Sequence, residues 1–213
     1  MLRNRKMTPI HNLRLFGFSL LVGLNHVSAV AGEYDSTGVI PDLPGNPSIS
    51  SFPVCYKHTC EVVETQSLTP AEWKQIHNIF QPAANTPESE RTLIKKAVAR
   101  MEILIGKKVN ASNDKGGNMA GVFADGNQMD CIDESSNTTT YLALMQKDDL
   151  LKWHQIQGTK TRGFFIFGMP HTTAVIKDNS TDQRWAVDSW FYDNGVEPEI
   201  LPISQWSDGW SPK

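Results

Sequence analysis

The 213 residues are 39% hydrophobic and 20% charged, and 23 acidic residues stand against 20 basic ones. This composition suits one globular domain with an ordinary core, and it excludes a wholly disordered chain. A mildly acidic balance also argues against a nucleic acid or an anionic membrane as partner.

Residues 1–31 have the pattern of a cleaved secretory signal. Four basic residues and no acidic one lie within residues 1–14, a ten-residue apolar run follows, and Ala29 and Ala31 are candidate cleavage positions. The apolar run is too short to span a bilayer comfortably, which takes about 20 residues, so an uncleaved anchor is the less favoured alternative. Removal of these four of the 20 basic residues leaves 16 against 23 acidic ones. We therefore expect an exported, acidic protein that makes no membrane contact after cleavage.

Residues 32–54 are rich in Gly, Pro and Ser and predict an extended lead-in, so that a single domain covers residues 55–213. Cys55 and Cys60 lie near the start of this domain. An exported protein meets oxidising conditions, which favours a disulfide between them. A zinc site that includes the intervening histidine is the alternative. The disulfide would leave the third cysteine of the chain as an unpaired thiol.

Two helices are predicted upstream of that third cysteine. Thr69 and Glu72 form a capping box at the start of a helix in residues 68–80. Thr86, followed by a proline, starts a second helix in residues 87–106, where apolar residues recur at helical spacing.

The third predicted helix carries the unpaired cysteine, Cys131. A polar, Gly-rich loop at residues 110–128 precedes it, and Asp130 is a good N-cap, so Cys131 falls in the first turn. A thiol at this position faces backbone N–H groups and the positive end of the helix dipole, which lowers its pKa and favours the thiolate. The pattern therefore predicts a nucleophile. A short fourth helix is predicted at residues 148–156.

The pattern then changes from helices to strands. Residues 162–167, 171–177 and 184–191 are rich in β-branched and aromatic residues and are bounded by turn residues, and residues 197–206 add a candidate edge segment. Helices followed by antiparallel strands predict an α+β fold, in which the helix that bears the nucleophile packs on a C-terminal antiparallel sheet.

The predicted hairpin brings a histidine and an aspartate together. A two-residue turn at Asn179-Ser180 makes the numbers of paired residues add up to 359, and this places His171 directly opposite Asp188. Their Cβ atoms would then lie about 4.5–5.5 Å apart on one face of the sheet. A nucleophilic cysteine needs a base, and the base needs an orienting acceptor, so the sequence predicts a Cys131-His171-Asp188 triad.

The motifs that carry these residues resemble a known family. They are "DCID" (130–133), "PHTTAVI" (170–176) and "WAVDSW" (185–190). Together they are similar to the transglutaminase-like, papain-related cysteine peptidases, and in particular to those of the bacterial periplasm. The resemblance covers about a third of the chain. It implies a transglutaminase/papain-like core, a location in the periplasm or outside the cell, and attack of Cys131 on the amide carbonyl of a protein or peptide to form a thioester.

The resemblance also suggests supporting residues. The oxyanion would lie near the backbone N–H of Cys131, with Gln128 or Asn127 as a second donor. Apart from the resemblance, aromatic residues crowd the C-terminal end of the sequence, and Trp190 among them is a candidate for the substrate groove. No cofactor is required. Some similar proteins bind calcium through acids that flank the cysteine, and Asp130 and Asp133 match that pattern, whereas residue 132 is an isoleucine in place of an acid.

Two other functions remain compatible with the sequence. The triad cannot separate hydrolysis from transglutaminase-type acyl transfer, because only the acceptor of the acyl group differs. A non-catalytic binding module on a degenerate protease fold is the third possibility, and it would be indicated by a missing member of the triad.

Overall fold

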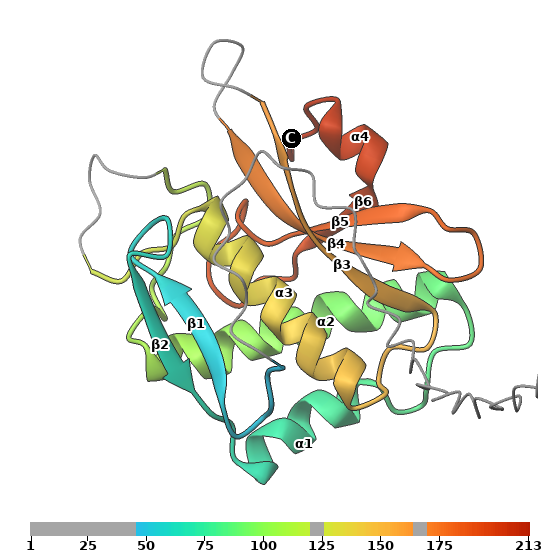
Figure 1. Cartoon of the computed structure of the whole chain (residues 1–213), viewed down its shortest axis with the longest axis horizontal. Helices are drawn as coiled ribbons and strands as arrows, with labels where there is room; N and C mark the ends of the chain where they lie inside the picture. The colour runs from blue at the N-terminus through green and yellow to red at the C-terminus, as the bar shows by residue number, and fades with distance from the viewer. Residues whose placement is uncertain (1–45, 120–125, 164–169) are drawn as a thin grey trace, which may run out of the picture. The chain divides into compact units, whose positions relative to one another are not determined.

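The computed structural model describes residues 46–119, 126–163 and 170–213. These residues belong to one of two compact units, residues 32–213. The signal predicted for residues 1–31 and most of the predicted lead-in lie outside the described residues. The described part is a mixed α+β structure with two antiparallel sheets (Figure 1). Its elements are β1 (Phe52–Tyr56), β2 (Val62–Gln66), α1 (Pro70–Ile79), α2 (Pro87–Lys108), α3 (Cys131–Lys147), β3 (His154–Arg162), β4 (His171–Asp178), β5 (Arg184–Asp188), β6 (Glu199–Pro202) and α4 (Ile203–Ser207).

Strands β1 and β2 form a hairpin that the sequence did not predict. The hairpin pairs Phe52 with Gln66 and Tyr56 with Val62, so ordered structure begins within the predicted lead-in. Next to its turn, Cys55 and Cys60 form the predicted disulfide. Their sulfur atoms are bonded to each other, so they do not form the alternative zinc site.

Helices α1 and α2 begin where their caps predict. The side chain of Thr69 accepts a hydrogen bond from the backbone N–H of Glu72, whose carboxylate in turn accepts from the N–H of Thr69. Thr86 and Ser89 form the same reciprocal pair at the start of α2. These bonds satisfy backbone donors that a helix start leaves free, so local sequence alone determines both starts.

Helix α3 lies between the β1–β2 hairpin and the four-stranded sheet (Figure 1). Its apolar residues Leu142 and Met145 are fully buried in the same core as Ala174 and Ile176 of β4. The side chain of Asn137 forms two hydrogen bonds with the backbone of Cys55 in β1, at 2.7 and 2.8 Å. The helix is therefore held by packing on one side and by buried hydrogen bonds on the other, as its weak helix propensity requires.

The larger sheet has the order β3-β4-β5-β6, with every neighbouring pair antiparallel. The strand predicted at residues 171–177 is confirmed as β4, and β6 lies within the predicted edge segment. Strand β5 ends at Asp188, three residues before the predicted end, because the chain turns where the N–H of Tyr192 bonds to the carbonyl of Ser189. Most of the strand predicted at 162–167 lies outside the described residues.

The prediction of a helix at residues 148–156 is wrong. Asp148 instead caps the end of α3, and β3 begins at His154. The reason is a tertiary contact: the buried carboxylate of Glu90 in α2 accepts the backbone N–H groups of Lys152, Trp153 and His154. In a helix these three N–H groups would instead donate to the carbonyl oxygens four residues earlier.

Among the described residues, no helix combines the length and the apolar character needed to cross a membrane.

Candidate active site

Cys131 is the first residue of α3, as predicted. Its Sγ lies 4.0 Å from the carbonyl oxygen of Pro170, and the backbone N–H of Thr172 also faces the sulfur. The thiol therefore lies beside the short segment of backbone that carries His171 at the start of β4.

Two aspartates fix the first turn of α3 on either side of Cys131. Oδ1 of Asp130 accepts the N–H groups of Ile132 and Asp133, at 2.9 and 3.1 Å. The carboxylate of Asp133 in return accepts the N–H of Asp130 at 3.1 Å. This capping box positions the backbone N–H of Cys131 at the free end of the helix.

The turn of the β1–β2 hairpin binds the same two aspartates. The N–H of Thr59 donates to Asp130 at 3.0 Å, and the N–H of Cys60 donates to Asp133 at 2.7 Å. Because the Cys55–Cys60 disulfide closes this turn, the disulfide and the start of α3 form one connected unit.

The hairpin register differs from the prediction by two residues. Pairs such as Ala174 with Val187 and Lys177 with Arg184 show that the turn holds four residues, 179–182. His171 and Asp188 are therefore not directly opposite each other. Side chains alternate between faces with a period of two, so a shift of two residues leaves both on the same face as diagonal neighbours.

The histidine and the aspartate are hydrogen-bonded despite this shift. Nε2 of His171 lies 2.6 Å from Oδ2 of Asp188, and the two residues are only 6% and 1% exposed. The indole N–H of Trp206 donates to the same oxygen, also at 2.6 Å. An ionised carboxylate only accepts, so Nε2 of His171 must carry the proton of the shared bond. The other ring nitrogen, Nδ1, then has a free lone pair.

Nδ1 of His171 is buried and makes no hydrogen bond with the described residues. A proton acceptor for the thiol would need this tautomer and this unpaired nitrogen. Sγ of Cys131 has its hydrogen-bond contact with the Pro170 carbonyl and makes none with Nδ1 of His171.

Aromatic side chains surround His171. The ring centres of Trp190, Phe191 and Trp206 lie 4.6, 5.1 and 5.5 Å from the imidazole. The indole N–H of Trp190 donates to the carbonyl of Asn118, which fixes the ring beside the histidine. Its predicted role in a substrate groove stays a prediction.

Sequence reasoning missed Trp206. It lies in α4, a five-residue helix without a side-chain cap, and it is completely buried. Several tryptophans crowd this end of the sequence, and no spacing rule singles out the one that reaches Asp188.

The predicted lowering of the Cys131 pKa is wrong for this arrangement. Burial raises the pKa of the thiol to about 11, and the negative charges of Asp130 and Asp188 add to the effect. The N–H of Thr172 lowers the pKa, more strongly than either aspartate raises it, and the N–H of Cys131 itself lowers it least, but burial outweighs both. The helix start therefore does not produce a thiolate unaided, and a base is required.

The two predicted oxyanion donors are engaged elsewhere. Nε2 of Gln128 donates to the carbonyl of Asn113, and Nδ2 of Asn127 donates to the carbonyl of Val109. Both amides thereby tie the segment before α3 to the loop after α2. Each NH2 group has two N–H donors, so one donor of each amide is used in this way, and their predicted role at the oxyanion stays a prediction.

The calcium site suggested for Asp130 and Asp133 stays a prediction. Calcium takes six to eight oxygen ligands. Among the described residues, the imidazole of His58 is the side chain that groups with both carboxylates, within 4.8 Å, and it offers a nitrogen ligand. Burial and the neighbouring Asp130 charge raise the pKa of Asp133 to about 7.

Three further carboxyl groups are buried in the fold, and no sequence pattern predicted them. Glu102 accepts the N–H of Gly195, Asp114 that of Met129, and Glu134 the hydroxyl of Ser189. Burial is the main cause that raises their pKa values: to about 8 for Glu102, to about 6 for Asp114 and well above the ordinary value for Glu134. Glu102 ties α2 to the loop at Gly195, Asp114 ties the loop after α2 to the segment before α3, and Glu134 ties α3 to the residue that follows β5.

No family model, no curated protein and no solved structure matches this chain.

Proposed function

We propose that the protein is an exported cysteine hydrolase that cleaves amide bonds of a protein or peptide. Cys131 is the nucleophile, His171 is the base, and Asp188 orients and stabilises the imidazole. The observation that carries this proposal is the hydrogen bond between Nε2 of His171 and Asp188, which leaves Nδ1 of the same ring as a free acceptor.

The proposed reaction begins when the thiol turns from the Pro170 carbonyl and gives its proton to Nδ1 of His171. The sulfur attacks the amide carbonyl carbon, and the carbonyl oxygen takes the negative charge near the N–H of Cys131. The C–N bond then breaks, and the leaving amine takes the proton from His171. Water, activated by the same histidine, hydrolyses the thioester and regenerates the thiol.

Burial of the thiol makes His171 indispensable in this scheme. A thiol with a pKa of about 11 is almost entirely protonated at neutral pH. An imidazolium beside the sulfur would stabilise the thiolate as an ion pair, as opposite charges within about 4–6 Å favour the charged form.

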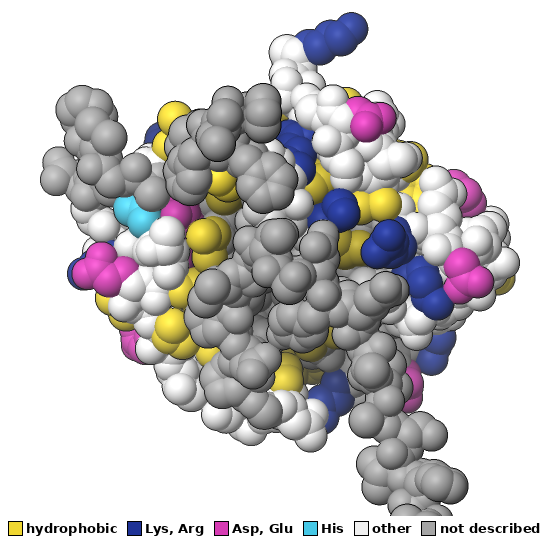
Figure 2. Space-filling model, turned by 45° about the horizontal axis from the view of Figure 1, so that its top comes forward, with side chains coloured by type: hydrophobic (Ala, Val, Ile, Leu, Met, Phe, Trp, Pro, Cys, Tyr) yellow, Lys and Arg dark blue, Asp and Glu magenta, His cyan; other side chains and the backbone are white. Residues whose placement is uncertain are grey.

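The fold and the disulfide support the proposal at a coarser level. A helix that begins with the cysteine and packs on an antiparallel sheet is compatible with a transglutaminase/papain-like core. The disulfide is consistent with export. Figure 2 shows hydrophobic, acidic and basic side chains scattered over one face of the molecule.

The test is to measure amine release from peptide and isopeptide substrates by the wild type and by Cys131→Ala. We expect release by the wild type and none by the variant. Release that persists in the variant would overturn the assignment. A labelled amine in the same assay separates hydrolysis from acyl transfer, because only transfer incorporates the label into the glutamine donor.

A further inference from the structure

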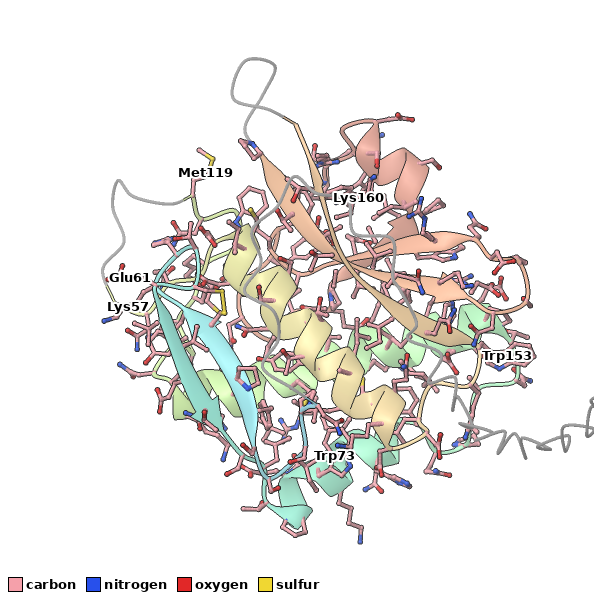
Figure 3. The ribbon with its side chains drawn as sticks, in the orientation of Figure 1. Lys57, Glu61, Trp73, Met119, Trp153 and Lys160 are labelled. Atoms are coloured by element: carbon pink, nitrogen blue, oxygen red, sulfur yellow. A yellow bond between two sulfur atoms is a disulfide. The ribbon has the colours of Figure 1, made fainter. Side chains whose placement is uncertain are left out.

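Three side chains of the kind that bind metals meet between the β1–β2 turn and the start of α3. One ring nitrogen of His58 and one carboxylate oxygen each of Asp130 and Asp133 all lie within 4.8 Å of one another. Figure 3 labels Lys57 and Glu61, which flank the tip of this turn beside the first turn of α3.

His58 has buried ring nitrogens without partners. Neither Nδ1 nor Nε2 makes a hydrogen bond with the described residues, although both are shielded from solvent. A buried polar group without a partner is unfavourable. The imidazole is thus close enough to the two carboxylates to share an ion with them, yet it is not hydrogen-bonded to either.

The backbone conformation of the turn is costly and holds His58 in this place. Lys57, His58, Thr59 and Cys60 have φ values of 67°, 58°, 52° and 55°, four consecutive left-handed residues without a glycine. Such strain persists only where the surroundings enforce it, and it clusters at functional sites. Here the disulfide and the hydrogen bonds to the two aspartates enforce it.

Both carboxylates keep room for another ligand. A carboxylate has about four lone-pair positions. Asp130 accepts three backbone N–H groups, and Asp133 accepts those of Asp130 and Cys60, with the N–H of His58 also facing it. At least one position therefore remains on each.

We propose that His58, Asp130 and Asp133 bind one divalent transition-metal ion of the zinc type. Imidazole together with carboxylate oxygens suits zinc, and three protein ligands with water as the fourth make a common zinc geometry. This donor set differs from the oxygen cage that calcium requires. The ion would fasten the disulfide turn onto the first turn of α3. The inference does not depend on the proposed hydrolase activity.

The test is calorimetric titration of the metal-free protein with zinc chloride. It uses Cys131→Ser as the parent, because a free thiol binds zinc by itself. We expect one ion per chain and a rise in melting temperature. In the same background, His58→Ala should lower the affinity at least tenfold. His77→Ala, which removes an exposed histidine of α1, should leave it unchanged.

A second variant, His58→Gln, and the melting temperature of each metal-free variant separate lost binding from lost folding. Calcium chloride at the same concentrations should give no melting shift. Absence of stoichiometric zinc binding by the parent would overturn the proposal. So would undiminished binding by folded His58 variants, or calcium binding as tight as that of zinc.

Discussion

The hydrogen bond from Trp206 to Asp188 makes a quantitative prediction. Trp206→Phe keeps an aromatic ring beside His171 but removes one of the two donors to Oδ2 of Asp188. Both partners are almost completely buried, so water cannot readily replace the lost donor. A hydrogen bond to a charged group contributes about 1.5–3 kcal/mol. We expect the free energy of unfolding to fall by about that amount, with a further loss from the smaller ring.

Trp185→Phe is the control, at a tryptophan that is half-buried. The indole N–H of Trp185 is buried but makes no hydrogen bond with the described residues, and Arg91 lies 3.8 Å above its ring. The same substitution there should cost only part of a cation–π contact, about 0.5–1 kcal/mol.

Urea unfolding followed by far-ultraviolet circular dichroism measures both losses, since tryptophan fluorescence changes in the variants themselves. Alkylation of Cys131 at neutral pH should also slow in Trp206→Phe and stay unchanged in Trp185→Phe. Equal losses of stability in the two variants would refute the reasoning, because they would show that ring size rather than the hydrogen bond to Asp188 is responsible.

Two further predictions concern stability. Asn137→Ala breaks both buried hydrogen bonds to the backbone of Cys55 and should lower the free energy of unfolding by about 2–4 kcal/mol in urea; a loss below 1 kcal/mol would show that α3 does not depend on this contact. The raised pKa values of Glu102 and Asp114, about 8 and 6, mean that the folded protein keeps protons that the unfolded chain releases. The stability from these groups is therefore complete below about pH 4 and is lost progressively as the pH rises to about 6 for Asp114 and to about 8 for Glu102, by up to about 1.4 kcal/mol per pH unit for each group. Melting temperatures measured between pH 4 and pH 9 should show this decline, and Glu102→Gln should flatten its upper part; an unchanged slope in that variant would contradict the assignment.

Features that depend on neighbouring residues were predictable from the sequence. The caps at Thr69, Thr86 and Asp130 predicted three helix starts, because each cap satisfies donors within three residues of itself. The disulfide followed from two cysteines close together in an exported chain.

Features that depend on distant residues were not predictable. The segment at 148–156 reads as a helix until Glu90, about sixty residues away, binds its N–H groups. The partner of Asp188 in α4 left no pattern in the sequence. The pKa of Cys131 depends on how deeply the thiol is buried, which no local motif reveals.

The hairpin shows an intermediate case. The turn was placed one residue too early, which shifted the register by two, but the alternation of side chains kept His171 and Asp188 on the same face. The pairing of these residues was therefore predictable although the register was not.

The central claim is that His171 removes the proton of Cys131, and the pH dependence of alkylation tests it most directly. The rate of iodoacetamide labelling is measured from pH 5 to pH 10 for the wild type and for His171→Ala, with Cys131→Ala as the unlabelled control. A thiolate–imidazolium pair predicts a wild-type rate that is nearly constant between about pH 6 and 8. In His171→Ala the thiol keeps its raised pKa of about 11, so the rate should increase about tenfold per pH unit over the same range. The same steep increase in both proteins would contradict the account, because it would show that the thiol titrates alone.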